Sequence, residues 1–538
     1  MKKYILPTLT IVCLMIGFLV GHALNNQANA QQRYYVYNGQ IYSQEQSKVD
    51  QLLQIMARNY VDELDVDSIT EEVMRDIIQK LDPHSSYIPK EDLELTQSEL
   101  SGSFSGIGVQ FNIMQDTVSI VAIIPGGPCE SIGVLAGDKI IMVDDSLFVG
   151  KKINNEKVMH TLRGPKGTKV KLGIKRNGTK EMLTYTVTRG DIPVASVDAT
   201  FIIEGGKQKI GFVRVNKFAD TTYREFITAL AELRAKGATR YIIDLRENSG
   251  GYMDQAIKMA NEFLRKDEMI VYAEGSRYPR YEAKANGLGR FLDVPVVVLV
   301  DEFSASASEI FAGAMQDNDR AQIIGRRSFG KGLVQQPFNL NDGSQVRITV
   351  ARYYTPSGRC VQKPYELGDQ EDYYHDMEER YNHGELFAAD SIHYKDTTTY
   401  YTKSGRVVHG GGGIMPDIFV GRDTTRNTPW YNRCVNMAYT YQFAYKYTDK
   451  NRKKLTQYKD WKALEQYLLS QDLVGEFAKF AQEKGVEPDQ AEIAKSRPLV
   501  VRLLNAYIVR NILGDKGFFP LFERDDEITK KAVEVLSK

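Results

Sequence analysis

Three serines alternate with alanines in the segment 301–317, where an apolar stretch gives way to a helical pattern. Ser304, Ser306 and Ser308 follow the continuous apolar run 294–300. A serine at a strand-to-helix turn presents its hydroxyl at the edge of a sheet, beside the free N–H groups and the positive dipole of the helix N-terminus. That placement favours a nucleophile elbow of the kind that hydrolases use, although each of these serines could simply cap the helix.

A lysine between two glycines follows the serine segment. Lys331 lies between Gly330 and Gly332, directly before a predicted strand at 333–338. If its side chain is buried among apolar groups, desolvation disfavours the ammonium form and lowers the pKa of the amine. A neutral lysine can take the proton from a serine hydroxyl, and Gln335 could hold the amine by a hydrogen bond. The alternative is a turn lysine in solvent.

Paired glycines follow a buried strand that is predicted at 240–245. Gly250 and Gly251 leave their backbone N–H groups bare, which suits an oxyanion hole shared with the N–H of Ala307. A simple turn before the next helix, predicted at 253–264, would explain the same glycines.

The predicted secondary structure differs between regions of the chain, and these regions would position the candidate residues. Residues 46–100 and 430–538 show the helical spacing of apolar residues. Residues 102–189 contain short β-rich stretches between glycine and proline turns, with one helix at 155–162. From 210 to 355, strands and helices alternate, which predicts a layered α/β domain.

Composition excludes several classes of protein. Lys and Arg number 69 and Asp and Glu number 69, so the formal net charge is zero, and we expect no nucleic-acid partner. Beyond the first 30 residues the cysteines are Cys129, Cys360 and Cys434. They are too far apart for a disulfide framework or for closely paired zinc ligands, and we expect neither a metal nor another cofactor.

The N-terminus has the layout of a secretory signal peptide. Lys2 and Lys3 precede an apolar run at 5–20, and Ala28-Asn29-Ala30 offers a small-residue cleavage site. We therefore expect removal of residues 1–30 and export to the periplasm or cell envelope. The alternative is an uncleaved anchor, because the run could nearly span a bilayer, and contact with a membrane would then be limited to the N-terminus.

Four short motifs, in this order, resemble those of the C-terminal processing peptidases, also called tail-specific proteases. They are Leu81-Asp-Pro-His-Ser-Ser-Tyr87, Ser304-Ala-Ser-Ala-Ser-Glu309, Phe329-Gly-Lys-Gly332 and Tyr354-Thr-Pro-Ser-Gly358. The resemblance covers residues 46–420. It implies that Ser306 is the nucleophile, that Lys331 is the general base and that Gln335 supports the lysine. It also implies a crotonase/ClpP-like α/β core.

The β-rich region resembles a PDZ module. The residues that match the carboxylate-binding loop of that module are Gly106, Ile107, Gly108 and Val109. Consecutive N–H groups there can hold the terminal carboxylate of another chain. The strand 108–113 would accept a substrate tail as an added strand, and the helix 155–162 would form the other wall. Arg163, which ends that helix, matches a family arginine that can couple the PDZ domain to the active site; a local ion pair or solvent exposure is the alternative.

Together these patterns predict a multidomain α+β chain with helical N- and C-terminal regions. The expected parts are a signal peptide (1–30), an N-terminal helical region (31–100), a PDZ domain (101–190), a serine protease core (191–363 and 410–425), a polar insertion (364–409) and a C-terminal helical region (426–538). The predicted function is a serine endopeptidase that cleaves exported proteins near their C-termini, on substrates with apolar C-terminal tails. An adaptor or a homo-oligomer is a further possible partner.

Two other functions fit parts of the sequence. A catalytically inactive PDZ scaffold in the cell envelope would keep the fold without the reaction, but the intact Ser306, Lys331 and Gln335 argue against it. A crotonase-like acyl-transferase or hydratase would need a cofactor pocket and no peptide-binding module, so the PDZ-like loop argues against that function.

Overall fold

The computed structural model of the chain describes residues 34–37, 40–43, 48–114, 116–176, 178–206, 208–393 and 398–538. The chain divides into two compact units, one ending at Ile77 and one comprising Ile78–Lys538. The predicted signal peptide or anchor at 1–30 lies outside the described residues. None of the described helices is both long and apolar enough to cross a membrane.

The first unit combines a hairpin with helices. Strands β1 (Tyr34–Tyr37) and β2 (Gln40–Ser43) pair antiparallel, and α2 (Lys48–Asn59) and most of α3 (Val66–Gln79) follow. The prediction for 31–100 is a helical region. The hairpin is an addition that the pattern did not reveal, because strands of four residues are too short to show a clear alternation.

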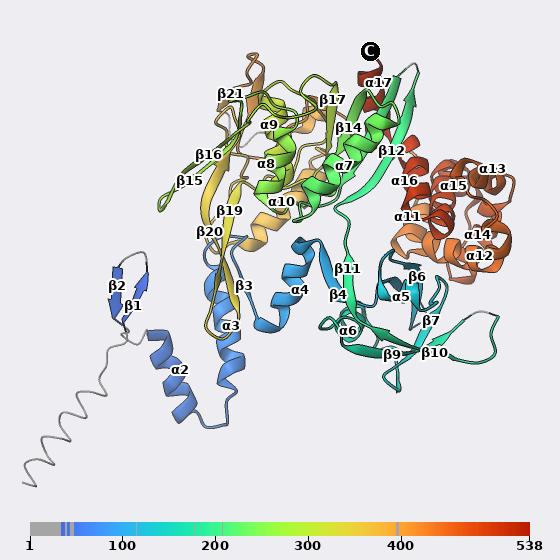
Figure 1. The fold of residues 1–538 in the computed structure, drawn as a ribbon, viewed down its shortest axis with the longest axis horizontal. Helices are drawn as coiled ribbons and strands as arrows, with labels where there is room; N and C mark the ends of the chain where they lie inside the picture. Colours follow the sequence, from blue (N-terminus) through green and yellow to red (C-terminus); the bar gives the residue numbers. More distant parts are fainter. Residues whose placement is uncertain are drawn as a thin grey trace, which may run out of the picture. The chain divides into compact units, whose positions relative to one another are not determined.

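A six-stranded sheet forms the centre of the second unit, with strand order β12-β13-β14-β17-β18-β23. Figure 1 labels β12, β14 and β17 of this sheet. Its strands are β12 (Val197–Gly205), β13 (Gln208–Val215), β14 (Arg240–Asp244), β17 (Val296–Val300), β18 (Gln322–Gly325) and β23 (Ile418–Phe419). Strand β12 is antiparallel to β13, and the other neighbouring pairs are parallel. The carboxyl ends of β14 and β17 therefore meet at one edge, which brings together the loops that carry Gly250 and Ser306.

Helices cover both faces of this sheet. Strand β17 is buried along its whole length, and its side chains alternate between two hydrophobic cores. Val298 and Val300 join the core that contains α7 (Thr222–Ala235), α8 (Met253–Asn261) and α9 (Ala307–Asp317). Val297 and Leu299 join the core formed by the C-terminal helices. The C-terminal helices thus complete the second face of the central sheet.

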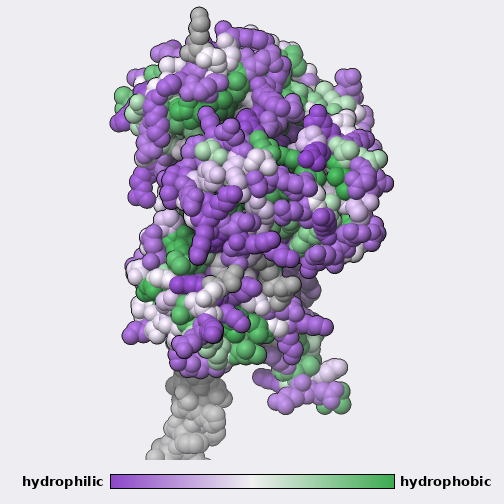
Figure 2. Space-filling model, turned by 90° about the vertical axis from the view of Figure 1, so that its right-hand side faces the viewer, coloured by the Kyte–Doolittle hydropathy of each residue, from purple (hydrophilic) through white to green (hydrophobic). Residues whose placement is uncertain are grey.

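Seven helices make up the C-terminal region, and the last two of them contact the strands of the central sheet. They are α11 (Pro429–Asn436), α12 (Tyr439–Leu455), α13 (Trp461–Leu469), α14 (Leu473–Glu483), α15 (Gln490–Leu513), α16 (Asp515–Arg524) and α17 (Glu527–Ser537). The face shown in Figure 2 is mainly hydrophilic, with apolar side chains in small scattered patches, as is ordinary for a surface in contact with water.

A second sheet carries the lysine loop. Its strand order is β16-β15-β20-β19, and β3 also pairs with β20. These strands are β3 (Ser86–Ile88), β15 (Met269–Gly275), β16 (Tyr278–Lys284), β19 (Leu333–Asn339) and β20 (Gln345–Tyr354). Lys331 lies just before β19. The segment expected as a polar insertion contains α10 (Gln370–Asn382), a 3₁₀ turn (Ala389–Ser391), β21 (Thr399–Tyr401) and β22 (Val407–His409).

The PDZ-like region forms a sheet of its own with strand order β10-β9-β7-β6-β5. Its elements are β5 (Val109–Met114), β6 (Thr117–Ile123), α5 (Pro128–Ser131), β7 (Lys139–Val143), β8 (Ser146–Leu147), α6 (Asn155–Leu162), β9 (Lys169–Lys175) and β10 (Leu183–Thr188). Strand β4 (Ser103–Gly106) pairs with β11 (Gly190–Pro193) where the chain enters and leaves the region, and α4 (Lys90–Ser101) precedes it. Strand β5 lies at the end of the sheet order, so its outer edge is unpaired within this sheet.

Candidate active site

The structure distinguishes the three candidate serines. The hydroxyl of Ser304 donates to the carbonyl of Leu245 (2.8 Å), and that of Ser308 donates to the carbonyl of Asn248 (2.9 Å). Both serines are fully buried, so they tie the helix start to the neighbouring loop. Ser306 is only partly buried and precedes the first residue of α9, with φ of 56°. A positive φ at a residue other than glycine costs energy and is characteristic of functional turns.

A buried carboxylate connects the serine and lysine segments. Glu309 accepts hydrogen bonds from the backbone N–H of Ser306 (2.9 Å), Gly330 (2.8 Å) and Lys331 (2.8 Å). It also accepts from the hydroxyl of Ser328 (2.5 Å). Burial raises the pKa of Glu309 to about 7, against the lowering effect of these four donors. One side chain therefore fixes the backbone of both candidate catalytic residues.

We did not single out Glu309 as a site residue from the sequence. The signal that could have revealed it is the serine-to-glutamate spacing of a capping box, in which the glutamate returns to the N–H of the first residue. That spacing accounts for the bond to Ser306. It cannot show the three donors from residues 328–331.

Lys331 lies half-buried beside the helix start. Burial lowers the pKa of its amine below the ordinary value, while the charges of Asp82 and Glu309 act in the opposite direction. The hydroxyl of Tyr353 is within hydrogen-bond distance of the carbonyl oxygens of both Ser306 (3.0 Å) and Lys331. Because Glu309 and Tyr353 each bridge the same two residues, the two backbone segments lie within about 6 Å of each other, two hydrogen-bond lengths.

Gln335 contacts a second polar group near the lysine. Its side-chain N–H donates to the hydroxyl of Thr349 (3.4 Å), which donates to the carboxylate of Asp82 (3.0 Å). We expected Gln335 to hold the amine of Lys331, and that bond is not among those made by the described residues. Asp82 also accepts the N–H of His84 (2.9 Å), so the 81–87 motif lies at the site.

His84 packs against the insertion. Its ring nitrogen Nε2 is 2.8 Å from the hydroxyl of Tyr373 in α10. Burial, together with the charge of Lys331, lowers the pKa of His84 to about 3. The imidazole is therefore neutral at physiological pH, and its ring makes an edge contact with the ring of Tyr373 (5.1 Å between centres). Tyr373 also contacts the ring of Phe329, so α10 covers the lysine loop.

Gly250, the first of the paired glycines, lies directly against the turn that contains Ser306. A Cβ at Gly250, where φ is 103°, would be 2.7 Å from the Cβ of Ser306 and 3.0 Å from the N of Ala307. The N–H of Gly250 itself donates to Asn248 (2.9 Å). Ala307 is the first residue of α9, so its N–H has no partner within the helix. Within the part of the chain that the structure describes, the N–H groups of Ala307 and Gly251 donate no hydrogen bond.

Four of the five predicted tail-binding residues, Ile107, Gly108, Val109 and Arg163, line a cavity of about 1510 Å³. Ile107, Gly108 and Val109 contribute from the loop and β5, and Val158 and Leu162 contribute from α6. The carbonyls of Ile107 and Gly108 accept from the N–H of Cys129 and Ile124 (both 3.0 Å), which orients the loop. Gly106 lies beside this segment, paired with Gly190 of β11. One part of the cavity therefore lies between the open edge of β5 and α6, and the rest extends to residues of β12, α7 and α16.

Arg163 contacts the entrance of the PDZ-like region. Its guanidinium lies 4.1 Å from the centre of the Phe104 ring, and it is 3.4 Å from the hydroxyl of Ser98 in α4. Helix α4 follows β3, which pairs with β20 beside the lysine loop. Arg163 thus connects the end of α6 to a segment that leads to Asp82 and Lys331.

Comparisons with known proteins identify the two main regions. Residues 209–373 match the model of peptidase family S41, residues 105–187 match that of the PDZ domain, and residues 430–514 match a family of unknown function.

The similar proteins are bacterial proteases. The chain is 37% identical to a carboxy-terminal-processing protease of Bartonella bacilliformis over 56% of this chain and 69% of that protein. It is 35% identical to the carboxy-terminal processing protease CtpA of Bacillus subtilis, over 59% and 66%, and 36% identical to a carboxyl-terminal-processing protease of a Picosynechococcus, over 52% and 67%. The chain belongs to peptidase family S41, the family of these carboxy-terminal-processing proteases, and it carries their kind of serine-peptidase region together with a PDZ domain.

Proposed function

We propose that the chain is a serine endopeptidase that cuts exported proteins near their C-termini, with Ser306 as nucleophile and Lys331 as general base. The observation that supports this function best is the shared carboxylate of Glu309, which accepts the N–H groups of both residues. One buried group thus holds together the two backbone segments from which the hydroxyl and the amine project.

The reaction would proceed in two steps. Neutral Lys331 takes the proton of the Ser306 hydroxyl as Oγ attacks the carbonyl carbon of the scissile bond. The ammonium then returns this proton to the leaving amine as the C–N bond breaks, which leaves an acyl-enzyme on Ser306. A water molecule then attacks the ester carbon as Lys331 takes one of its protons. The bond between this carbon and Ser306 Oγ breaks, the ammonium returns the proton to Oγ, and the new C-terminus is released. The lowered pKa of Lys331 favours the neutral form that this role requires.

The oxyanion of the tetrahedral intermediate needs hydrogen-bond donors near Ser306. We propose the N–H groups of Ala307 and Gly251 for this role. Gly250 contributes to the oxyanion hole by packing closely on Ser306. Its own N–H already donates to the side chain of Asn248. Gln335 then serves the lysine through Thr349 and Asp82 rather than by direct contact.

In this proposal the PDZ domain selects the substrate by binding its C-terminal tail. The tail of a substrate would pair with β5, its carboxylate would be held by the loop Gly106–Val109, and its last apolar side chain would enter the cavity beside α6. Arg163 would couple occupancy of this groove to the active site through α4.

Several finer assignments accompany this proposal. We assign a crotonase/ClpP-like core to residues 191–363 and 410–425, a PDZ domain to 101–190, an insertion to 364–409 and helical regions to 31–100 and 426–538. We also propose export to the periplasm or envelope by the segment 1–30, apolar-tailed protein substrates, and an adaptor or second copy as a further partner.

Mutation of the two reacting groups tests the function. Purified wild type, Ser306→Ala and Lys331→Ala are incubated with an unstructured protein that ends in apolar residues. Both variants should lose about 10³-fold or more in kcat, and wild-type activity should rise with pH as the amine deprotonates. Equal cleavage by wild type and Ser306→Ala would refute the dyad, and tight tail binding without cleavage by any of the three would favour the inactive scaffold.

A further inference from the structure

A buried arginine follows the strand that leads to the paired glycines. Arg246 comes two residues after Asp244, the last residue of β14. Its guanidinium forms two bonds with the Asp244 carboxylate (2.8 and 2.7 Å). The Asp244 side chain is fully buried and Arg246 is nearly so. This pair lies at the carboxyl edge of the central sheet, on the loop that ends at Gly250 and Gly251.

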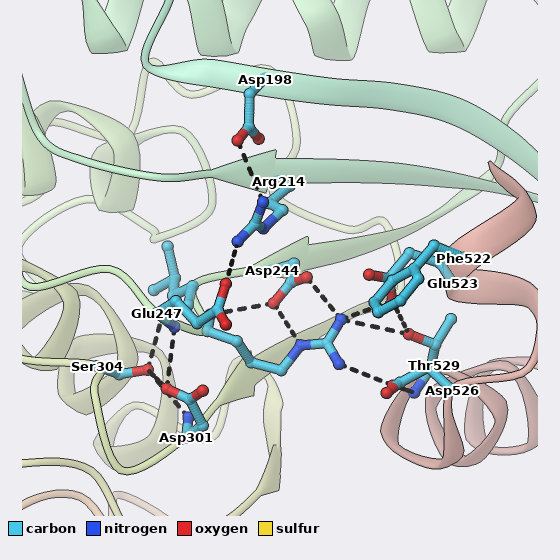
Figure 3. Close-up of polar contacts among 12 residues, drawn as sticks. Asp198, Arg214, Asp244, Glu247, Asp301, Ser304, Phe522, Glu523, Asp526 and Thr529 are labelled. Carbon is cyan, nitrogen blue, oxygen red and sulfur yellow. Dashed lines mark hydrogen bonds and ion pairs between the residues drawn. The ribbon is translucent and has the colours of Figure 1, made fainter. Parts of the chain in front are cut away.

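The other partners of Arg246 come from the end of the chain. Its guanidinium contacts Glu523 of α16 (2.7 Å) and Asp526 (2.7 Å), and it lies 3.4 Å from the hydroxyl of Thr529 in α17. Figure 3 shows Asp244 on one side of this network and the three C-terminal residues on the other. Thr529 also donates to Glu523 (2.7 Å). The C-terminal helices thus supply most of the ionic partners of an arginine in the active-site loop.

A second contact joins the same elements. Arg214 of β13 bonds to Glu247 (2.6 Å) and to Asp198 (3.2 Å). The guanidinium of Arg214 also lies 5.1 Å from the centre of the Phe519 ring in α16. The residue after Arg246 is therefore connected to α16 as well, although the carboxylate of Glu247 is largely exposed and contributes less than the buried network.

Hydrogen bonds connect the loop 245–250, which contains Arg246, to the turn before Ser306. The N–H of Glu247 donates to Asp301 (3.0 Å), and the carbonyl of Asn248 accepts from Ala305 (3.0 Å). Together with the bond from Ser304 to Leu245, these contacts join the loop 245–250 to the turn before Ser306 residue by residue. A shift of Arg246 would therefore displace Gly250 and Gly251 relative to Ser306.

We propose that Glu523 and Asp526 are positioning residues for the peptidase active site. They hold Arg246 in place, and Arg246 in turn holds the loop 245–251 that carries Gly250 and Gly251. This inference rests on the proposed function of Ser306, Lys331 and Gly251. A buried guanidinium that loses a carboxylate partner is strongly destabilised, so Arg246 would leave its site and take the loop with it. The last two helices, which lie beyond the matched residues 430–514, thus become part of the catalytic core.

Three variants of the full chain test this inference. Glu523→Gln removes one charge from the network. Asp526→Asn removes the second C-terminal charge and is milder, because an asparagine can still accept the N–H of Thr529 that caps α17 (2.9 Å). Glu465→Gln is the matched control. It removes the charge of Glu465 and one acceptor of the paired bonds from Arg524 (2.7 and 2.8 Å). This ion pair lies at the residue next to Glu523 and does not involve Arg246.

The measurements are kcat and KM on a protein with an apolar tail, together with the urea midpoint of each variant. Glu523→Gln should lower kcat about tenfold with KM unchanged, since the loop moves while the PDZ groove does not. Asp526→Asn should lower kcat by a smaller factor. Glu465→Gln should lower the urea midpoint and leave kcat within about twofold of wild type.

Different results would contradict the role of Glu523 and Asp526 and the proposed peptidase function. If Asp526→Asn and Glu523→Gln are folded and both keep the wild-type kcat, the inference alone is wrong. If Glu523→Gln fails to fold, Asp526→Asn decides by the same criterion. If the control loses as much kcat as the two network variants, the effect is general loss of stability and the inference is wrong. If wild type shows no cleavage that depends on Ser306, the proposed function is wrong and the inference falls with it.

Discussion

Replacement of Gly250 by alanine is the sharpest test of how the active-site loop contacts the nucleophile. The added methyl group would lie 2.7 Å from the Cβ of Ser306, 2.8 Å from the carbonyl of Ala305 and 3.0 Å from the N of Ala307. These are backbone atoms or atoms next to the backbone, so a side-chain rotation cannot relieve the overlap. The variant therefore acts directly on the turn that presents the hydroxyl and the proposed oxyanion donor.

The size of the effect follows from two terms. The φ of 103° at Gly250 is unfavourable for an L-residue by about 1–2 kcal/mol. Carbon atoms in ordinary contact are about 3.5–4.0 Å apart, so the methyl group and Ser306 must separate by about 1 Å. A displacement of about 1 Å costs about 10²-fold in rate, or about 2.7 kcal/mol of transition-state stabilisation. We expect kcat to fall by that factor while KM for a tailed substrate stays the same.

Gly150→Ala provides the matched control. Gly150 has a similar φ of 108°, and a Cβ there would meet nothing within 4 Å. It should lose stability from backbone strain and keep its kcat. Kinetics with a tailed protein substrate and urea unfolding of both variants separate strain from displacement. A kcat for Gly250→Ala within about twofold of wild type would show that the glycine is required only for its turn.

Two further predictions concern the base and the groove. Asp82→Asn removes a negative charge that raises the pKa of Lys331, so the rise of kcat/KM with pH should move to lower pH; an unchanged profile, or one moved to higher pH, contradicts this placement of the charge. Gly108→Ala places a Cβ 2.8 Å from the Cα of Gly127 and should raise KM for tailed proteins about tenfold, without changing kcat on a short peptide that lacks the tail. Gly133→Ala, at a similar φ of 84° with open space around it, should leave KM unchanged, and an equal rise in both variants would contradict the role of the loop.

Strongly patterned elements were predictable from the sequence. The run 294–300 predicts a buried strand, and β17 is buried throughout, since a central strand covered on both faces must be apolar at every position. Strands with a weaker pattern were not predicted. Strands β12, β15 and β16 mix polar and apolar residues, because only part of each is buried. Their place is set by the strands they pair with, and their own pattern is weak.

The sequence alone also determined local chemistry. It placed Ser306 at the start of a helix and Lys331 between two glycines, because turn geometry and helix capping depend on residues within a few positions. It did not determine which partner each charged group would meet. The carboxylate of Glu309 collects donors from the lysine loop, and a nearby Gln335 contacts Thr349 where a bond to the lysine was expected.

Only the tertiary structure shows which surface the C-terminal helices at 430–538 cover. Helical spacing predicts that 430–538 forms helices with apolar faces, but the period of a helix does not specify which surface covers that face. Here the C-terminal helices pack on the central sheet, and α16 and α17 bring Glu523 and Asp526 to Arg246. Such contacts between distant residues exist only once the chain has folded, because they follow from the packing of whole elements rather than from any local pattern.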